Sequence, residues 1–182
     1  MQYIAFLRGI NVGGKNKIKM AELRKLMEEK SLTKVRTYIQ SGNILFESDR
    51  KENELINHLE VSIHERFGFF VPVIIRTAAE LQSILVRCPF SEEEIAAAAS
   101  SAAGECLYLA LLQEIPSPEA SQSLLSLNSE GETCQLEERQ VYLLVHDTIR
   151  KSKVADYLNK QFSPVTIRNW KTIRKLVSMA ES

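Results

Sequence analysis

Residues 35–46 have the sequence Val35-Arg36-Thr37-Tyr38-Ile39-Gln40-Ser41-Gly42-Asn43-Ile44-Leu45-Phe46. Apolar and polar side chains alternate in the first half of this segment, which is typical of a strand with one buried face. Ser41, Gly42 and Asn43 are turn-forming residues, and an apolar segment follows them. The sequence therefore predicts a β-hairpin here.

A strand and a helix are predicted on each side of this hairpin. Residues 3–8 form a mostly apolar strand, and residues 20–30 carry apolar side chains at helical spacing. The second helix ends at Gly68, a residue suited to the left-handed conformation at a helix C-terminus. The last strand of this half contains Pro72, whose missing N–H restricts it to a sheet edge. Residues 1–76 are thus expected to form a ferredoxin-like half with the order βαββαβ.

The rest of the chain predicts a helical connector over residues 77–104 and a second half over residues 105–182. A near-continuous apolar run at 106–112 is typical of a buried strand. Two further segments, 133–137 and 140–145, predict a second hairpin. With helices between and after these strands, this half has the expected order βαββαα. The fold class expected is therefore α+β, with the ferredoxin-like half packed with a second, partly similar half.

Composition excludes several classes of protein. The 182 residues are 45% hydrophobic and 25% charged, as in an ordinary globular protein. No apolar run approaches the roughly 20 residues of a membrane helix, and the N-terminus lacks a signal peptide. We therefore expect a cytoplasmic protein without a membrane partner. The three cysteines and three histidines show neither disulfide-framework nor metal-ligand spacing, so no metal site is predicted.

The chain has no net charge at pH 7, but its charges are unevenly distributed. Residues 1–40 carry nine Lys/Arg and three Asp/Glu, and residues 150–182 carry eight and two. Residues 41–149 between them carry six and eighteen. Such asymmetry concerns partners rather than fold. It favours an anionic partner held by the two ends of the chain; the alternative is a mixed, solvated surface.

The glycine-rich loop after the first strand is the strongest candidate for an anion site. Its glycines can adopt positive φ and direct several backbone N–H groups toward one anion, and a helix N-terminus follows. The candidate ligands here are Arg8, Gly9, Asn11, Gly13, Gly14, Lys15 and Lys17. The P-loop motif G-x-x-x-x-G-K-S/T is not matched, because Asn16 follows Lys15 where Ser or Thr would be needed. The dinucleotide-binding motif G-x-G-x-x-G is not matched either. The alternative is a tight, purely structural connection from strand to helix.

The predicted hairpin supplies a second group of candidate ligands. These are Tyr38, Gln40, Ser41 and Asn43. Because side chains alternate along a strand, Tyr38 and Gln40 share one face of the sheet, where they could line a cleft between the two halves. The alternative is that these residues stabilise the turn of the hairpin.

The start of the last helix supplies the third group, Arg168, Asn169 and Trp170. Asn169 is a favoured N-cap residue, and the guanidinium of Arg168 suits bidentate binding of phosphate or carboxylate. Trp170 could stack on a ligand ring or, alternatively, anchor its helix in the core. Lys153 lies on the preceding basic helix, where it is either a ligand or a solvated side chain.

Three segments resemble the hallmarks of the DUF1697 family of bacterial proteins. They are Arg8-Gly9-Ile10-Asn11-Val12-Gly13-Gly14-Lys15-Asn16-Lys17-Ile18-Lys19-Met20, Thr37-Tyr38-Ile39-Gln40-Ser41-Gly42-Asn43, and Thr166-Ile167-Arg168-Asn169-Trp170-Lys171-Thr172, the last preceded by Ser152-Lys153. The resemblance spans essentially the whole chain. It implies a two-part α+β fold and supplies no catalytic residue, because no activity is established for the family.

The charges and the candidate residues favour one functional hypothesis over two others. We expect a phosphate-bearing small molecule or nucleotide to bind in a basic cleft between the two halves, lined by Arg8, Asn11, Lys17 and Arg168. RNA or single-stranded DNA is the first alternative, because RNA-recognition domains share the ferredoxin-like topology. A protein-interaction module without a small ligand is the second. The sequence identifies no cofactor and leaves both catalysis and oligomeric state open.

Overall fold

A computed structural model describes all residues, 1–182. The elements in chain order are β1 (Gln2–Leu7), α1 (Met20–Glu29), β2 (Thr33–Tyr38), β3 (Asn43–Glu47), α2 (Glu52–Phe67), β4 (Val73–Thr77), α3 (Ala78–Val86), α4 (Glu92–Ser101), β5 (Leu107–Leu112), α5 (Pro118–Leu125), β6 (Glu132–Glu137), β7 (Gln140–Val145), the 3-10 helix η1 (Ile149–Lys151), α6 (Lys153–Gln161), β8 (Val165–Asn169) and α7 (Trp170–Glu181). The chain forms two compact units, Met1–Gln82 with Leu176–Ser182, and Ser83–Lys175.

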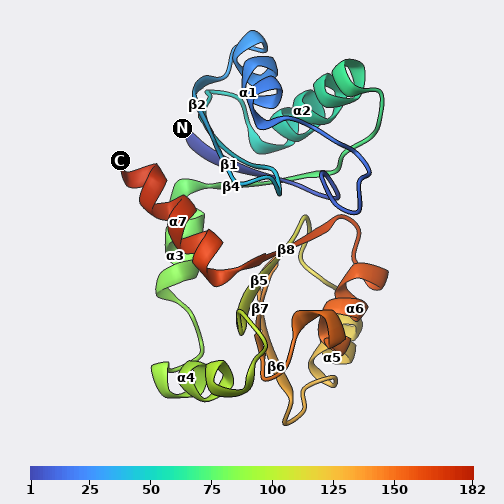
Figure 1. Ribbon diagram of the computed structural model, residues 1–182, viewed down its shortest axis with the longest axis vertical. Coiled ribbons are helices and arrows are strands. Elements are labelled where there is room, and N and C mark those ends of the chain that lie inside the picture. Colours follow the sequence, from blue (N-terminus) through green and yellow to red (C-terminus); the bar gives the residue numbers. More distant parts are fainter. The chain divides into compact units, whose positions relative to one another are not determined.

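The first unit is a four-stranded antiparallel sheet with two helices on one face. The strand order is β2-β3-β1-β4, and α1 and α2 cover the same face (Figure 1). Apolar side chains at helical spacing, such as Leu23 and Leu59, fill the core between helices and sheet. The predicted order βαββαβ is confirmed. Strand β4 lies at a sheet edge and begins directly after Pro72, as the missing N–H of proline requires.

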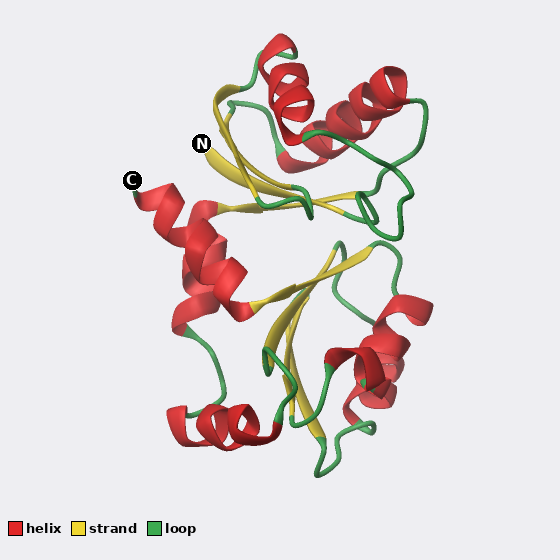
Figure 2. Ribbon diagram, viewed as in Figure 1, coloured by secondary structure: helices red, strands yellow, loops and turns green.

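The second unit contains another four-stranded antiparallel sheet, of order β6-β7-β5-β8. Helices α5 and α6 lie on one face of it and α4 on the other (Figure 2). The predicted hairpin is present as β6 and β7. Apolar side chains of β5 and β7, including Ala110 and Leu143, pack with Leu124 of α5 and Leu158 of α6 in the core.

The order βαββαα expected for the second half was wrong, because it omits β8. This strand pairs antiparallel with β5, so the observed order is βαββαβα. Only Val165 and Ile167 of its five residues are apolar, and the segment follows Pro164, so the sequence pattern is too short and too polar to indicate a strand. With β8 included, the second sheet has the same strand order as the first.

No helix of the protein combines the length and the apolar composition needed to cross a membrane.

Glu60 of α2 hydrogen-bonds the backbone at the start of β4. Its Oε1 accepts from the N–H of Val73 at 2.9 Å. Burial raises the pKa of Glu60 more than this hydrogen bond lowers it. The carboxylate is therefore a useful acceptor whose negative charge is unfavourable at this position.

We expect Gly42→Ala to destabilise the protein more than Gly68→Ala. Both glycines have φ +80°, so each substitution places an L side chain in the left-handed region at about 1–2 kcal/mol. A Cβ at Gly68 meets no atom within 4 Å, whereas one at Gly42 lies 2.6 Å from Ile10 Cδ1. This overlap should add about 1–3 kcal/mol to the loss, measured by urea denaturation. Equal losses for the two variants would contradict the prediction.

We also expect Glu60→Gln to be at least as stable as the wild type at pH 7. Glutamine keeps the acceptor for Val73, whereas Glu60→Ala removes it at a cost of about 1 kcal/mol. Because the folded-state pKa of Glu60 is raised, its ionisation reduces wild-type stability as pH rises above the ordinary range for a carboxyl. The advantage of Glu60→Gln in urea denaturation should therefore be larger at pH 7 than at pH 4. An advantage that grows on acidification would have the wrong sign.

Candidate functional site

The glycine-rich loop is a miniature hairpin. Lys15 N–H donates to Val12 O at 3.1 Å, and the two residues form an isolated β-bridge. Gly13 and Gly14 lie between them with φ 57° and 76°, positive as a type I′ turn requires at both central positions. Ile10 is buried at the base of the loop. These glycines thus form a tight turn. This is the purely structural role that the sequence left open as the alternative to anion binding.

Asn11 ties this loop to the hairpin of β2 and β3. Its Nδ2 donates to Gln40 O at 2.9 Å and to Ile18 O at 3.0 Å. Its Oδ1 accepts from the N–H of Ile18 at 2.9 Å. The amide that the sequence predicted as an anion donor is therefore occupied within the chain. Lys15 and Lys17 remain exposed.

The candidates of the second group build the hairpin turn. Asn43 is completely buried, and its Nδ2 donates to Tyr38 O at 2.9 Å and to Ser41 Oγ at 3.1 Å. Gln40 accepts the bond from Asn11 described above. The β-branched Ile39 has φ 50°, an uncommon conformation for such a residue. Hydrogen bonds from two asparagines thus hold a strained turn in one conformation.

Lys153 begins α6, whose N-terminus already holds a carboxylate of the chain. Glu132 of β6 is buried. Its Oε1 accepts from the N–H of Lys153 at 2.9 Å, and its Oε2 accepts from the hydroxyl of Ser152. Ser152 Oγ in turn accepts from Ala155 N–H at 2.9 Å as the N-cap. The N–H groups of Lys153 and Ala155, which would attract an external anion at this helix end, are therefore engaged within the chain.

Arg168 and Asn169 have structural roles within the second unit. The guanidinium of Arg168 donates to Thr166 Oγ1 at 2.6 Å and to Ile167 O at 3.1 Å. Burial lowers the pKa of Arg168 to about 10, so it stays charged at neutral pH. Asn169 Oδ1 accepts from the N–H of Thr172 at 2.8 Å, which confirms its predicted role as the N-cap of α7.

A surface hollow of about 670 Å³ lies among α4, the start of β5 and α7. This volume is in the range of small-molecule sites. Its lining consists of Ile95, Glu105, Cys106, Leu107, Trp170, Lys171, Arg174 and Lys175. The hollow therefore combines apolar side chains, one tryptophan, three cations and a single acid.

The three cations of the hollow lie within one turn of α7 and have no acidic partner. Lys171, Arg174 and Lys175 are exposed, and none forms an ion pair. Residues three and four apart in a helix have Cβ atoms about 5–6 Å apart. The cations of α1 differ, because Arg24 and Lys25 each pair with a glutamate one turn away. The positive charge in the hollow is thus not compensated by a salt bridge.

Trp170 forms the aromatic wall of the hollow. Its ring centroid lies 6.1 Å from that of Tyr142. The Tyr142 hydroxyl donates toward Ile84 O at 3.0 Å and Glu137 Oε2 at 3.2 Å, and the ring is almost completely buried. Tyr142 therefore supports the indole from within the sheet. Trp170 itself is partly exposed, which leaves part of its surface for contact with a ligand.

Cys106 contributes an inert thiol to the hollow. Its Sγ donates to Ile95 O at 3.7 Å. Burial raises the pKa of the thiol, so it is neutral at pH 7 and a weak nucleophile. The thiol therefore adds no charge to the hollow, whose charged groups are the three cations and Glu105.

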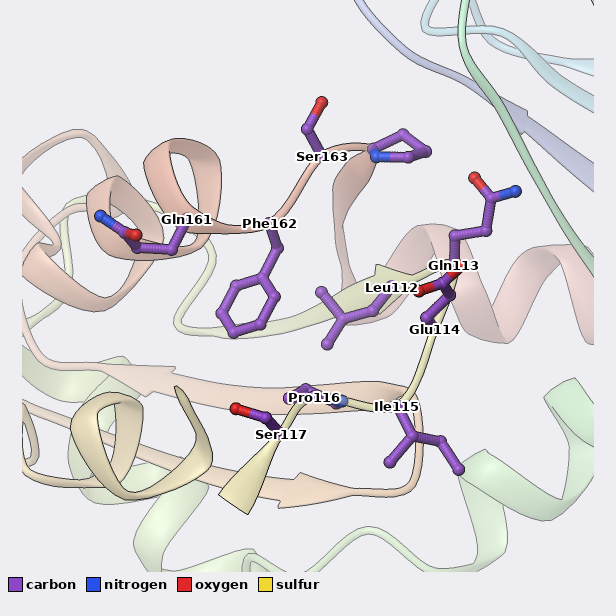
Figure 3. Close-up of a pocket in the computed structure, with 10 residues that line it drawn as sticks. Leu112, Gln113, Glu114, Ile115, Pro116, Ser117, Gln161, Phe162 and Ser163 are labelled. Atoms are coloured by element: carbon purple, nitrogen blue, oxygen red, sulfur yellow. The ribbon is translucent and has the colours of Figure 1, made fainter. Parts of the chain in front are cut away.

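A second pocket, of about 400 Å³, differs in its chemistry. Two segments line it, residues 112–117 at and after the end of β5 and residues 161–164 at and after the end of α6 (Figure 3). Leu112 and Phe162 point toward each other across it. Its only charged side chain is Glu114, so it does not suit an anion. No group of three or more His, Cys, Asp or Glu residues in the protein could hold a metal ion.

The predicted candidates are therefore distributed over several places. The loop and hairpin candidates of the first unit meet through Asn11. In the second unit, Lys153 lies at the start of α6, whereas Trp170 lines the α7 hollow. Sequence reasoning missed Lys171, Arg174 and Lys175. Their spacing along a helix was the available signal, but α4, which forms the opposite wall, comes from a distant part of the chain.

A family model described as "Protein of unknown function (DUF1697)" matches residues 1–142, so the chain belongs to this family. Among solved structures, the chain is similar to one described as conserved bacterial protein SP0830 from Streptococcus pneumoniae. The two chains share 27% sequence identity with a TM-score of 0.75, over 98% of this chain and 97% of the other. No curated protein matches the chain. The family resemblance and the α+β fold are thus confirmed.

We expect Asn11→Ala to destabilise the protein by about 2 kcal/mol, because it removes three hydrogen bonds worth about 1 kcal/mol or less each at this partly exposed position. Asn11→Asp should lose at least as much, because the second carboxylate oxygen would face the carbonyl oxygens of Gln40 and Ile18, where the amide donates. Lys15→Ala, an exposed change in the same loop, should stay within about 0.5 kcal/mol. Urea denaturation of the three variants tests this order, and a neutral Asn11→Ala would show that the loop does not depend on the amide.

Proposed function

We propose that this DUF1697 protein binds a phosphate-bearing small molecule or nucleotide, and that the hollow beside α7 is its binding site. One observation carries the proposal. Lys171, Arg174 and Lys175 lie unpaired within one helical turn and line the same hollow as the partly exposed Trp170.

The chemistry of these side chains suits phosphate. Arg174 offers a planar fork of N–H donors that matches two phosphate oxygens. Lys171 and Lys175 add compact charges within a turn of it. Three cations against one acid, Glu105, leave an excess of two positive charges, which corresponds to the charge of a phosphate monoester near pH 7.

This proposal keeps the ligand class expected from the sequence and moves the centre of the site. The glycine-rich loop has exposed lysines, but its other candidate residues already have structural roles. The Asn11 amide hydrogen-bonds within the chain, and the glycines form the turn between Val12 and Lys15. The α7 hollow has cations without partners. Trp170 belongs to both the predicted set and the proposed site.

Nothing comparable favours the nucleic-acid alternative. RNA-recognition sheets present stacking aromatic side chains on their central strands. In the first unit, the face of β1 and β3 opposite α1 and α2 carries Ile4, Phe6 and Leu45 at its middle. All three side chains are completely buried, so this face exposes no aromatic ring for stacking. We further propose a bacterial cytoplasm as the location, since all three cysteines are free thiols and the reducing cytoplasm keeps thiols in that state.

We expect inorganic phosphate, ribose 5-phosphate and nucleoside monophosphates, tested in parallel, to include ligands that raise the melting temperature, because a ligand specific for the folded state stabilises it. Arg174→Gln should weaken the binding of such a ligand by about tenfold or more, since a hydrogen bond to a charged group contributes about 1.5–3 kcal/mol. Isothermal titration calorimetry measures the affinities.

Lys160→Gln is the matched control. It removes an exposed cation from α6 without touching the hollow, so it should leave the affinity unchanged. The proposal fails if no phosphate compound binds at millimolar concentration, or if both variants weaken binding equally.

A further inference from the structure

We infer that the ligand of the α7 hollow is a ribonucleoside monophosphate, with its base against Trp170 and its single phosphate among Lys171, Arg174 and Lys175. This inference rests on the proposed function and narrows it to one class of phosphate compound. Three features of the hollow carry it: its aromatic and apolar walls, the confinement of its cations, and the position of its one acid.

The walls of the hollow suit a flat, apolar ring. Trp170 lines it together with Ile95 of α4 and Leu107 of β5. The Tyr142 ring supports the indole at 6.1 Å, so the indole is held in place before a ligand arrives. Every nucleobase has a face that stacks on an aromatic side chain. A sugar phosphate has no such face and would leave this part of the hollow wet.

The cations of the hollow suit one phosphate group. They lie within the five residues from Lys171 to Lys175, a rise of about 6 Å along a helix. A single phosphate placed over this turn can reach all three side chains. No other lysine or arginine lines the hollow. The second and third phosphates of a nucleoside triphosphate would therefore meet no further cation there.

Glu105 is the only acid in the lining. An ionised carboxylate accepts hydrogen bonds and donates none. In a site that also holds a phosphate, it would repel a second phosphate and accept from hydroxyl groups. Acidic side chains bind the ribose 2′-hydroxyl in this way in dinucleotide sites. The structure therefore assigns to Glu105 the recognition of the ribose.

Trp170 is the only tryptophan of the chain, so intrinsic tryptophan fluorescence reports on the hollow alone. We expect at least one of the four ribonucleoside 5′-monophosphates to quench this fluorescence saturably. The same compound should bind at least tenfold more tightly than ribose 5-phosphate in calorimetry, because only the nucleotide stacks. Its 2′-deoxy analogue should bind more weakly, and Glu105→Gln should reduce that difference.

Variants separate the base from the phosphate. Trp170→Leu should abolish the advantage of the nucleotide over ribose 5-phosphate while phosphate-dependent binding persists. Trp170→Phe should retain most of the advantage, since phenylalanine also stacks. Arg174→Gln should weaken both ligands in parallel. Circular-dichroism melting confirms that each variant is folded, and Lys160→Gln again serves as the control.

The outcomes distinguish this inference from the proposed function. If ribose 5-phosphate binds as tightly as every nucleotide, or if Trp170→Leu leaves nucleotide binding unchanged, the ligand does not stack on Trp170 and the inference is overturned. The proposed function survives both results provided that Arg174→Gln still weakens binding. If no phosphate compound binds the wild type, the proposed function fails and this inference fails with it.

Discussion

Two central strands, β1 and β5, are the constraint on which the structure depends. Each pairs with a strand on both sides, β1 with β3 and β4, and β5 with β7 and β8. Both strands are apolar on both faces, so neither face tolerates water. The helices lie where their apolar sides cover these strands, α1 and α2 in the first unit, and α5 and α6 in the second.

The proposed site follows from the second of these sheets. Tyr142 points from β7 away from the face covered by α5 and α6, and its hydroxyl is fixed at Ile84. Trp170 packs on that ring at the first residue of α7, directly after the cap Asn169. The direction of α7 then determines where Arg174 lies. These structural contacts thus place an aromatic surface and a group of cations beside the start of β5.

Local signals in the sequence predicted much of the fold. Gly68 marked the end of α2 and has the expected left-handed conformation, and Pro72 marked an edge strand. β8 was missed because it is a strand only through its pairing with β5, a long-range contact. The five residues that follow Pro164 give no local pattern that predicts this pairing. Asparagine was ambiguous as a site signal, since Asn11 and Asn43 can bind a ligand or their own backbone with the same atoms. The α7 hollow needed tertiary packing, because α4 supplies Ile95.

Glu132 places a carboxylate at the N-terminus of α6. The carboxylate belongs to β6, so its effective concentration at that helix terminus is on the order of millimolar or above, whatever the solution contains. Dissolved phosphate would have to displace the carboxylate of Glu132 there, and this buried carboxylate would then lose its hydrogen bonds. The N-terminus of α6 is thus capped by a carboxylate from within the chain, which leaves a dissolved anion few free donors there.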